Sequence, residues 1–356
     1  MERIERLREL LAQQSLEALL VSGAENRRYL SGFTGSAGVL IITAEEALLA
    51  TDFRYYEQVK MQAPAFALVE VVGPVVKALA AQVQRLDVHR VGFEAQNLSV
   101  ETYQQWQAEM PTVEWAPTQG LVESLRMAKD EAEITFIEEA VHLADAAMIH
   151  VMEWMRPGVT EREVSWELEV HMRTHGAERL AFTTIVGSGP NGAMSHAVTS
   201  DRPIAWGDSV VIDMGAMVQG YCSDLTRSFC LGQANEEYLA IWHTVLGAQE
   251  AAEQAIRPGL SGVEADATAR RIIYEAGYEG KFGHGLGHGV GLAIHEAPRA
   301  GMTSEDTLAV NQILTVEPGI YLPGQFGVRI EDMVVLTAEG CRVLTECPKT
   351  PVIAGR

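Results

Sequence analysis

The first third of the chain alternates between helical and strand-like hydrophobic patterns. Apolar residues recur at helical spacing between Ile4 and Leu11. Short apolar runs bounded by turn residues follow at 19–21, 39–42 and 47–50. This alternation predicts an α/β domain.

A second pattern begins after the polar turn residues at 117–120. Apolar residues recur at helical spacing from Ile134 to Ala144, and further helices are predicted at 163–175, 236–257 and 261–276. From Phe182 onward, glycine-rich turns separate strands rich in β-branched residues. We therefore expect two domains, residues 1–125 and 126–356.

Composition and charge narrow the class of protein. The 356 residues are 47% hydrophobic and 21% charged, which is typical of a globular protein, and the net charge of −21 argues against nucleic acid as a partner. No apolar run approaches the ~18 residues that span a bilayer, and the first residues lack the apolar core of a signal peptide. We expect a cytoplasmic protein with no membrane partner. The four cysteines show no C-x-x-C spacing, which argues against a zinc knuckle or a redox motif.

Two predicted hairpins each carry a pair of acidic residues. If the first hairpin turns between Val218 and Gln219, Asp213 faces Asp224 across the strands, with Cβ atoms roughly 4.5–5.5 Å apart. If the second turns at Gly324, Glu317 faces Glu331. One such pair is usually a solvated face. Two pairs in apolar strands predict a bound cation, because like charges placed opposite each other are destabilising.

Histidines cluster between the two hairpins. His284, His288 and His295 lie in a glycine-rich segment, where imidazoles could bind a metal or donate to an oxyanion, although a lone histidine in a strand is more often a core residue. His196 follows a loop of Gly, Ser, Pro and Asn, and a surface position is its alternative. The glycine spacing fits neither G-x-G-x-x-G nor the P-loop, and Arg299 stands where H-E-x-x-H needs its last histidine.

Taken in order and with their flanks, these residues resemble a known family. Asp213, Asp224, His288, Glu317 and Glu331 are similar to the five ligands of the dinuclear-metal pita-bread peptidases, which include methionine aminopeptidase, prolidase and aminopeptidase P. The resemblance runs from about Arg126 to the C-terminus, and its flanking motifs resemble the proline-specific M24B branch. It implies an α+β fold, in which a catalytic pita-bread domain follows a smaller creatinase-type α/β domain.

The resemblance also implies a mechanism. Asp213 would bind one divalent metal, His288 and Glu317 the other, and Asp224 and Glu331 would bridge the two. Glu317 would move a proton, and His196 and His295 would bind the substrate carbonyl and the oxyanion. Two further histidine and arginine positions are expected beside the site: His284 near the proline pocket and Arg329 behind the ligands. Manganese is the expected metal, with cobalt or zinc as alternatives.

Motifs of the first domain resemble a small, two-domain aminopeptidase P. By that resemblance Arg54 reaches the substrate, with a surface ion pair as its alternative, and Tyr321 lines the site, with strand packing as its alternative. We therefore expect an Xaa-Pro aminopeptidase that acts on proline-containing peptides and forms a homodimer. The alternatives are a prolidase restricted to Xaa-Pro dipeptides, a peptidase of relaxed specificity and a metal-free binding module.

Overall fold

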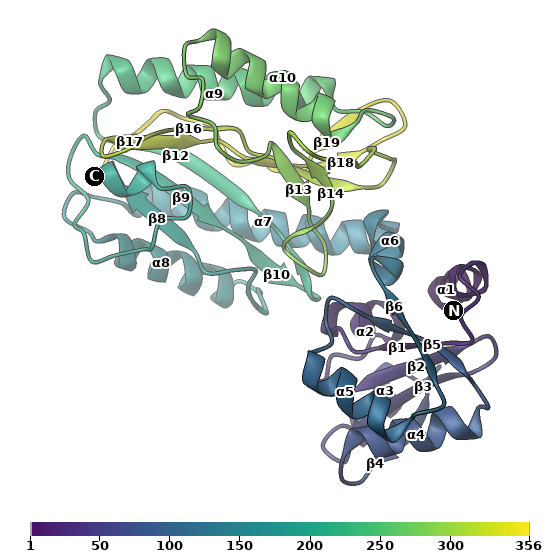
Figure 1. Cartoon of the computed structure of the whole chain (residues 1–356). Coiled ribbons are helices and arrows are strands. Elements are labelled where there is room, and N and C mark those ends of the chain that lie inside the picture. The colour runs from purple at the N-terminus through teal and green to yellow at the C-terminus, as the bar shows by residue number, and fades with distance from the viewer. Residues whose placement is uncertain (1, 356) are drawn as a thin grey trace. The chain divides into compact units, whose positions relative to one another are not determined.

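The chain folds into two compact units. The computed structural model describes residues 2–355, and one unit ends at Arg126 where the other begins at Met127 (Figure 1).

The N-terminal unit is built on one mixed six-stranded sheet with the order β4-β3-β2-β1-β5-β6. Its strands are β1 (Ala18–Val21), β2 (Val39–Thr43), β3 (Ala47–Asp52), β4 (Ala67–Val71), β5 (Arg90–Glu94) and β6 (Glu114–Thr118). Its helices are α1 (Glu2–Gln13), α2 (Ala24–Ser31), α3 (Tyr56–Gln62), α4 (Val75–Arg85), α5 (Val100–Glu109) and α6 (Leu121–Met127). The central strands β1 and β2 are buried along their whole length, which explains why they read as continuous apolar runs.

The C-terminal unit contains several small sheets whose strands come from distant parts of the sequence. The strands are β7 (Arg179–Leu180), β8 (Ile185–Ser188), β9 (Ser209–Met214), β10 (Ala216–Val218), β11 (Tyr221–Cys222), β12 (Leu225–Leu231), β13 (Gly287–Gly289), β14 (Glu296–Ala300), β15 (Ile313–Val316), β16 (Gly319–Leu322), β17 (Phe326–Arg329), β18 (Asp332–Leu336), β19 (Cys341–Val343) and β20 (Val352–Ile353). The helices are α7 (Glu131–Trp154), α8 (Glu161–Thr174), the 3₁₀ turn η1 (Gly189–Ala193), α9 (Glu236–Ala255) and α10 (Gly262–Glu275).

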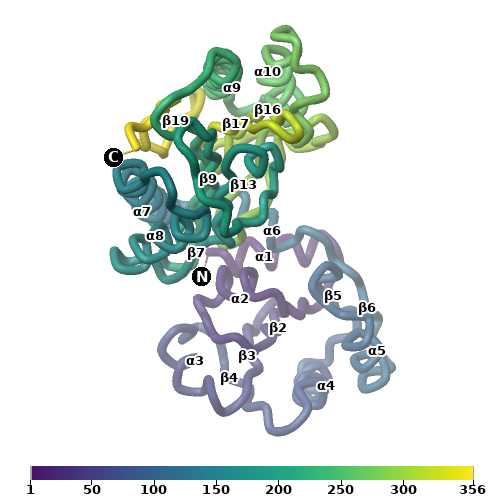
Figure 2. The backbone as a smooth tube through the Cα atoms, turned by 90° about the vertical axis from the view of Figure 1, so that its left-hand side faces the viewer, coloured from purple at the N-terminus to yellow at the C-terminus, as the bar shows by residue number. Residues whose placement is uncertain are grey.

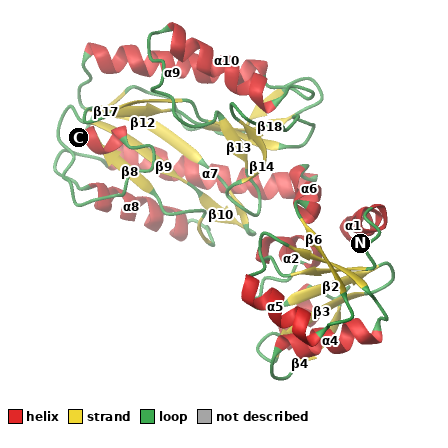
Figure 3. Ribbon diagram, in the orientation of Figure 1, coloured by secondary structure: helices red, strands yellow, loops and turns green. Residues whose placement is uncertain are grey.

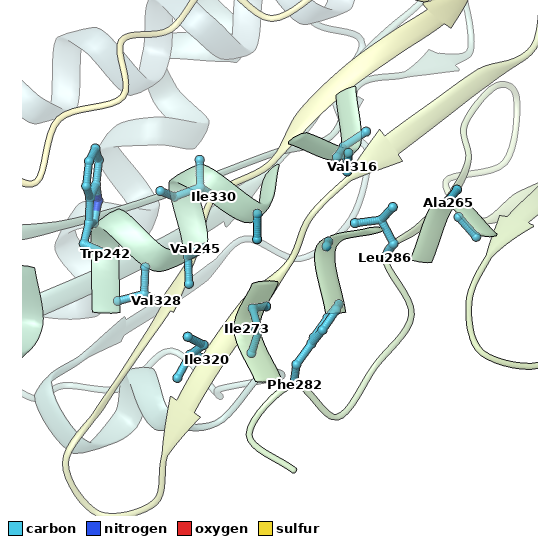
Figure 4. Close-up of a cluster of buried hydrophobic side chains, with 14 of the residues drawn as sticks. Trp242, Val245, Ala265, Ile273, Phe282, Leu286, Val316, Ile320, Val328 and Ile330 are labelled. Atoms are coloured by element: carbon cyan, nitrogen blue, oxygen red, sulfur yellow. The ribbon is translucent and has the colours of Figure 1, made fainter. Parts of the chain in front are cut away.

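Two helix pairs cover opposite faces of these strands. Helices α9 and α10 lie on one side and α7 and α8 on the other, in both views of the C-terminal unit (Figures 2 and 3). Each pair packs on its own apolar core. In the first core, Trp242 and Ile273 of the helices pack with Val316 and Val328 of the strands and with Ile330, which follows β17 (Figure 4). The predicted α+β architecture is confirmed.

Local sequence explains where the helices begin. Capping boxes open α7 at Asp130 and α8 at Thr160, where each cap accepts from the third helical N–H and a glutamate bonds back to the cap. Ser261 opens α10 in the same way. The helix predicted at 163–175 therefore begins two residues earlier, at Glu161.

The first acidic hairpin has a different register from the one predicted. Its turn consists of Gln219 and Gly220, both with positive φ (46° and 78°), as a tight two-residue hairpin turn requires. Asp213 consequently faces Thr226, and the prediction that it faces Asp224 directly was wrong. Asp224 lies two residues before Thr226. Asp224 itself lies in the break between β11 and β12, outside regular strand, where the charge of Asp213 still contributes to its raised pKa after burial and the charge of Glu331.

The register predicted for the second hairpin is confirmed. Leu322 pairs with Phe326 around Gly324, and Val316 pairs with Asp332 further along the same two segments. Glu317 and Glu331 lie between these two paired stretches, outside regular strand. The break leaves both carboxylates free to turn toward the same point.

Candidate metal centre and substrate cleft

A cleft of about 930 Å³ in the C-terminal unit brings most of the predicted site residues together. Nine of the eleven line it: His196, Asp213, Asp224, His284, His288, His295, Glu317, Arg329 and Glu331. Asp213, His288 and Arg329 lie in strands β9, β13 and β17, and the other six lie in segments that connect helices and strands. The cleft is therefore a product of the tertiary fold.

A group of buried ligand atoms forms the floor of this cleft. Asp224, His288 and Glu331 each offer an atom within 4.8 Å of the others, as a metal site requires. The His288 Nε2 lies 3.5 Å from Asp224 Oδ2 and 3.4 Å from Glu317 Oε1. The Nδ1 of the same ring is 3.1 Å from the Gly289 carbonyl oxygen, to which it donates. That bond leaves a lone pair on Nε2, directed at the carboxylates.

The pKa values of these groups reflect burial and mutual repulsion. Burial, followed by the charge of Glu331, raises the pKa of Asp224 well above its usual value. Burial and the charge of Glu317 do the same to the pKa of Glu331. Burial is also the largest cause that raises the pKa of Glu317, to about 7. Burial lowers the pKa of His288 to about 3, so its ring is neutral and able to act as a ligand.

The same carboxylates have oxygens with no partner. Asp213 Oδ1 and Glu331 Oε1 are buried and accept no hydrogen bond from any described residue. The other oxygen of each is held: Arg329 Nη2 donates to Asp213 Oδ2, and Thr226 Oγ1 donates to Glu331 Oε2 at 2.6 Å. A buried acceptor without a donor is costly. Bare oxygens beside a neutral imidazole fit divalent cations, which would remove both the desolvation penalty and the repulsion.

Arg329 connects this group to the rest of the cleft. Its Nε donates to Thr226 Oγ1 at 3.0 Å and its Nη1 to the Tyr321 hydroxyl at 3.0 Å. Burial alone would lower the pKa of Arg329, but Tyr321 and Asp213 raise it well above its usual value, so the side chain remains charged. Arg329 thus fixes the orientation of Asp213 directly and that of Glu331 through Thr226. Sequence reasoning did not single out Thr226, although it follows Asp224 by two residues.

His284 and Tyr321 form one hydrogen-bonded pair. The His284 Nδ1 lies 2.8 Å from the Gly285 carbonyl oxygen, and its Nε2 lies 2.8 Å from the Tyr321 hydroxyl. Burial, then Arg329, lowers the pKa of His284 to about 4. The neutral ring therefore donates from Nδ1 and accepts at Nε2. Both nitrogens are occupied, so His284 contributes a ring surface to the cleft, while Tyr321 contacts His284 and Arg329 behind it.

The side chains of His196 and His295 are less constrained by hydrogen bonds than that of His284. Both are exposed in the cleft, and within the described residues neither imidazole makes a hydrogen bond. The His295 ring packs edge-on against His288, with ring centroids 4.4 Å apart. Burial, then Arg299, lowers the pKa of His295, so at neutral pH it is an uncharged ring with an N–H to donate.

Arg54 lies in the N-terminal unit. Its side chain is 56% exposed and pairs with Asp52 at 2.7 Å. A role for Arg54 toward substrate stays a prediction.

Two features, one in the cleft and one next to it in the sequence, were not foreseen. Arg299, in β14, lines it with an exposed guanidinium that makes no ion pair with a described residue. Lys129, whose side chain is 1% exposed, pairs with Glu296, the residue that follows His295. Neither role had a sequence signal, because each depends on which segments meet in three dimensions.

Known proteins share both parts of this architecture. The sequence profile described as Metallopeptidase family M24 matches residues 135–338, and that of the Creatinase/Prolidase N-terminal domain matches residues 3–128. The chain belongs to metallopeptidase family M24. This M24 protein is an enzyme, a metal-dependent peptidase, as predicted.

Individual relatives of this M24 protein cover nearly its whole length. A Bacillus anthracis structure described as an Xaa-Pro dipeptidase shares 43% identity over 99% of both chains, with a TM-score of 0.97. The Xaa-Pro dipeptidase of Pyrococcus horikoshii is 36% identical over 97% of both chains. The X-Pro aminopeptidase structure from Thermotoga maritima shares 37% identity, covering 98% of this chain and 100% of its own, with a TM-score of 0.90. None of the described helices of this M24 protein is long and apolar enough to cross a membrane.

Proposed function

We propose that this M24 peptidase is an Xaa-Pro dipeptidase with two divalent metal ions. Asp213 would hold one ion, His288 and Glu317 the other, and Asp224 and Glu331 both. Unpartnered oxygens on Asp213 and Glu331 support this ligand set. The sequence motifs of the first domain had favoured an aminopeptidase, but the names of the Bacillus anthracis and Pyrococcus horikoshii relatives support the dipeptidase alternative better.

The dipeptidase proposal is supported by Arg299, which lines the cleft and has no carboxylate partner among the described residues. Of the two arginines that line the cleft, Arg329 is paired with Asp213, whereas Arg299 has no carboxylate partner among the described residues. An Xaa-Pro dipeptide ends in a carboxylate directly after its proline ring, and a longer peptide has a neutral amide there. A free guanidinium beside His295 would bind that carboxylate by a charge-assisted, bidentate hydrogen bond.

Different residues of the cleft have different roles in the proposed reaction. When bound, two divalent cations would activate a water molecule and polarise the scissile carbonyl. Arg329 and Thr226 hold carboxylates in place, and the bond from His288 to Gly289 fixes the tautomer of that ring. His196 and His295 would donate to the carbonyl oxygen as it becomes negatively charged.

Proton transfer falls to Glu317 in this proposal. The Xaa-Pro nitrogen has no hydrogen, so it must gain a proton in order to leave. The Glu317 carboxyl is buried, and its Oε1 lies 3.4 Å from His288 Nε2, which would place it beside the attacking water as the general base and acid.

Three further assignments belong to the proposal. The oxygen-rich ligand set supports manganese, with cobalt or zinc as alternatives, and metal analysis of the purified protein tests this. We propose a homodimer, which light scattering at micromolar concentration would contradict by giving a monomer mass. A cytoplasmic location is proposed with it.

The test compares three substrates in the presence of Mn²⁺. These are an Xaa-Pro dipeptide, the same dipeptide as its C-terminal amide, and an Xaa-Pro-Yaa-Yaa peptide. We expect the dipeptide to be cleaved with the highest kcat/KM. In Arg299→Met its KM should rise about 10-fold to 100-fold, with little change for the amide, because a hydrogen bond to a charged group contributes about 1.5–3 kcal/mol.

The matched control is Arg342→Met, which removes an exposed arginine paired with Glu138 outside the cleft. It should leave all three substrates unaffected. Equal KM changes for dipeptide and amide in Arg299→Met would refute carboxylate recognition, and faster cleavage of the longer peptide would refute the dipeptidase proposal.

Aminopeptidase activity on longer peptides is the second candidate. The relative named X-Pro aminopeptidase supports it, and so does the volume of about 930 Å³, near the upper end of pockets that bury a drug-sized ligand (about 300–1,000 Å³). The longer peptide in the same experiment distinguishes the two.

A further inference from the structure

We propose that Glu161 is a positioning residue for catalysis: its buried carboxylate fixes the two ends of the 188–200 segment and so holds His196 in the cleft. This inference rests on the proposed function, in which His196 contacts the substrate. Glu161 lies outside the cleft and does not touch the ligand group.

The Glu161 carboxylate accepts hydrogen bonds from two residues that lie twelve positions apart, Ser188 and Ser200. Glu161 is completely buried at the first position of α8. Its Oε1 accepts from the backbone N–H of Ser188 at 2.8 Å and from the Ser188 hydroxyl at 2.7 Å. Its Oε2 accepts from the backbone N–H of Ser200 at 3.0 Å and from the Ser200 hydroxyl. The Asn191 side-chain amide donates to both oxygens, at 3.0 and 3.1 Å.

These contacts need a carboxylate rather than an amide. Two backbone N–H groups and one side-chain amide can only donate here, so the side chain of Glu161 must accept at both ends. The helix N-terminus adds a favourable field for the negative charge. A glutamine would place an NH₂ group against one of these donors and leave a buried N–H without an acceptor.

His196 depends on this anchoring because it has none of its own. The imidazole of His196 makes no hydrogen bond within the described residues, so its position follows from the backbone around it. Regular structure in the segment is limited to the short 3₁₀ turn Gly189–Ala193. Nearer to His196, the carbonyl oxygen of Ser195 accepts from Arg329 Nη1 at 3.1 Å. Glu161 at the two ends and Arg329 in the middle therefore set where His196 lies.

The chain should still fold when Glu161 is changed. The Thr199 hydroxyl accepts from the Val186 N–H and donates to the Thr184 carbonyl oxygen, which keeps the segment attached to β8. Glu163 supplies a matched control, because it lies in the same first turn of α8 and, among residues 2–355, bonds only to its cap, Thr160.

The experiment measures hydrolysis of an Xaa-Pro dipeptide by Mn²⁺-loaded Glu161→Gln, Glu163→Gln, His196→Ala and the double variant Glu161→Gln/His196→Ala. We expect Glu161→Gln to lower kcat about 100-fold with KM changed less than about threefold, since a displacement of about 1 Å can cost that much. Glu163→Gln should keep kcat within about twofold. In the His196→Ala background, Glu161→Gln should lower kcat by less than about threefold, because both substitutions act through the His196 imidazole.

Hydrogen exchange gives a readout that is independent of activity. Amides of 188–200 should exchange faster in Glu161→Gln than in wild type, while those of α9 should not change. If the wild type fails to cleave Xaa-Pro substrates, the proposed function fails, and exchange still tests the anchoring. Normal kcat, unchanged exchange or fully additive losses in the double variant would each overturn the positioning role. Should Glu161→Gln not fold, Ser200→Ala removes one of the donors and should shift kcat and exchange in the same directions by smaller factors.

Discussion

Replacing Glu317 by glutamine should stabilise the metal-free protein at alkaline pH. Burial, together with Asp213, raises the pKa of Glu317 from 4.5 to about 7, while Arg329 partly opposes the rise. The folded state therefore binds the proton more tightly than the unfolded state does. As the pH rises from about 4.5 to about 7, ionisation of this carboxyl lowers the free energy of unfolding. The full loss of stability is present above that range.

The pKa difference sets the size of the effect. At ~1.4 kcal/mol for each pKa unit, an ionised Glu317 costs about 3 kcal/mol at pH 8 and about 1 kcal/mol at pH 5. The side chain is 17% exposed, so solvent screens it little. Glutamine has no charge to desolvate and can still accept from Thr315. We thus expect Glu317→Gln to be about 3 kcal/mol more stable than wild type at pH 8.

Urea unfolding after treatment with a chelator measures this difference at several pH values. The advantage of Glu317→Gln should shrink steadily as the pH falls from 8 to 5. Addition of Mn²⁺ at pH 8 should make the wild type more stable than Glu317→Gln. A cation that binds only the folded state stabilises the wild type more than a variant that lacks a ligand.

A metal-free variant that is no more stable than wild type at pH 8 would refute the reasoning. So would a stability difference that does not change with pH, since it would show that packing and not charge is responsible. Thr337→Ala, a change outside the cleft, controls for nonspecific effects of mutation on unfolding.

Three further predictions follow from the same physical arguments. Asp224→Asn should lower peptidase activity by more than about 100-fold while leaving the chelated protein at least as stable in urea; retained activity would remove Asp224 from the ligand set. Lys129→Met should cost about 3–5 kcal/mol in unfolding free energy by removing the buried cation beside Glu296, and Lys129→Met/Glu296→Gln should recover much of it; an additive loss would contradict the pairing. Burial and the neighbouring His175 lower the pKa of His171, so the folded protein loses stability as the pH falls below the unfolded pKa of 6.5. Between pH 7.5 and 5.5, His171→Gln should therefore lose less melting temperature than wild type in thermal melts.

Much of the fold could be predicted because its signals are local. Apolar periodicity predicts helix α8, and the capping box at Thr160 places its start at Glu161, two residues before the predicted one. The second hairpin followed from its glycine-centred turn. In the first hairpin the register was wrong because the positive φ values at Gln219 and Gly220 set the turn one position later than expected.

Candidate ligands were visible in the sequence for a different reason. Asp213, Asp224, Glu317 and Glu331 interrupt apolar segments that would be more stable without charge, and such conflicts with local preference mark functional positions. Their roles as ligands stay predictions. That the chain is an M24 peptidase was predicted from these residues and their flanks and is confirmed by the family match.

The sequence by itself predicted helices α1, α7, α8, α9 and α10, strands β1 to β3, the register of the second hairpin and the residue types that a metal site needs, because periodicity and turn signals act over a few positions. Only the tertiary structure decided which groups meet. The bond that Arg329 donates to Asp213 spans 116 positions, and the bond that Ser200 donates to Glu161 spans 39. The ion pair between Lys129 and Glu296 likewise depends on how distant segments pack, as does the position of Arg299, which has no ion pair with any residue from 2 to 355. Partners so far apart leave no pattern along the chain, and burial, which sets their pKa values, exists only once the chain has folded.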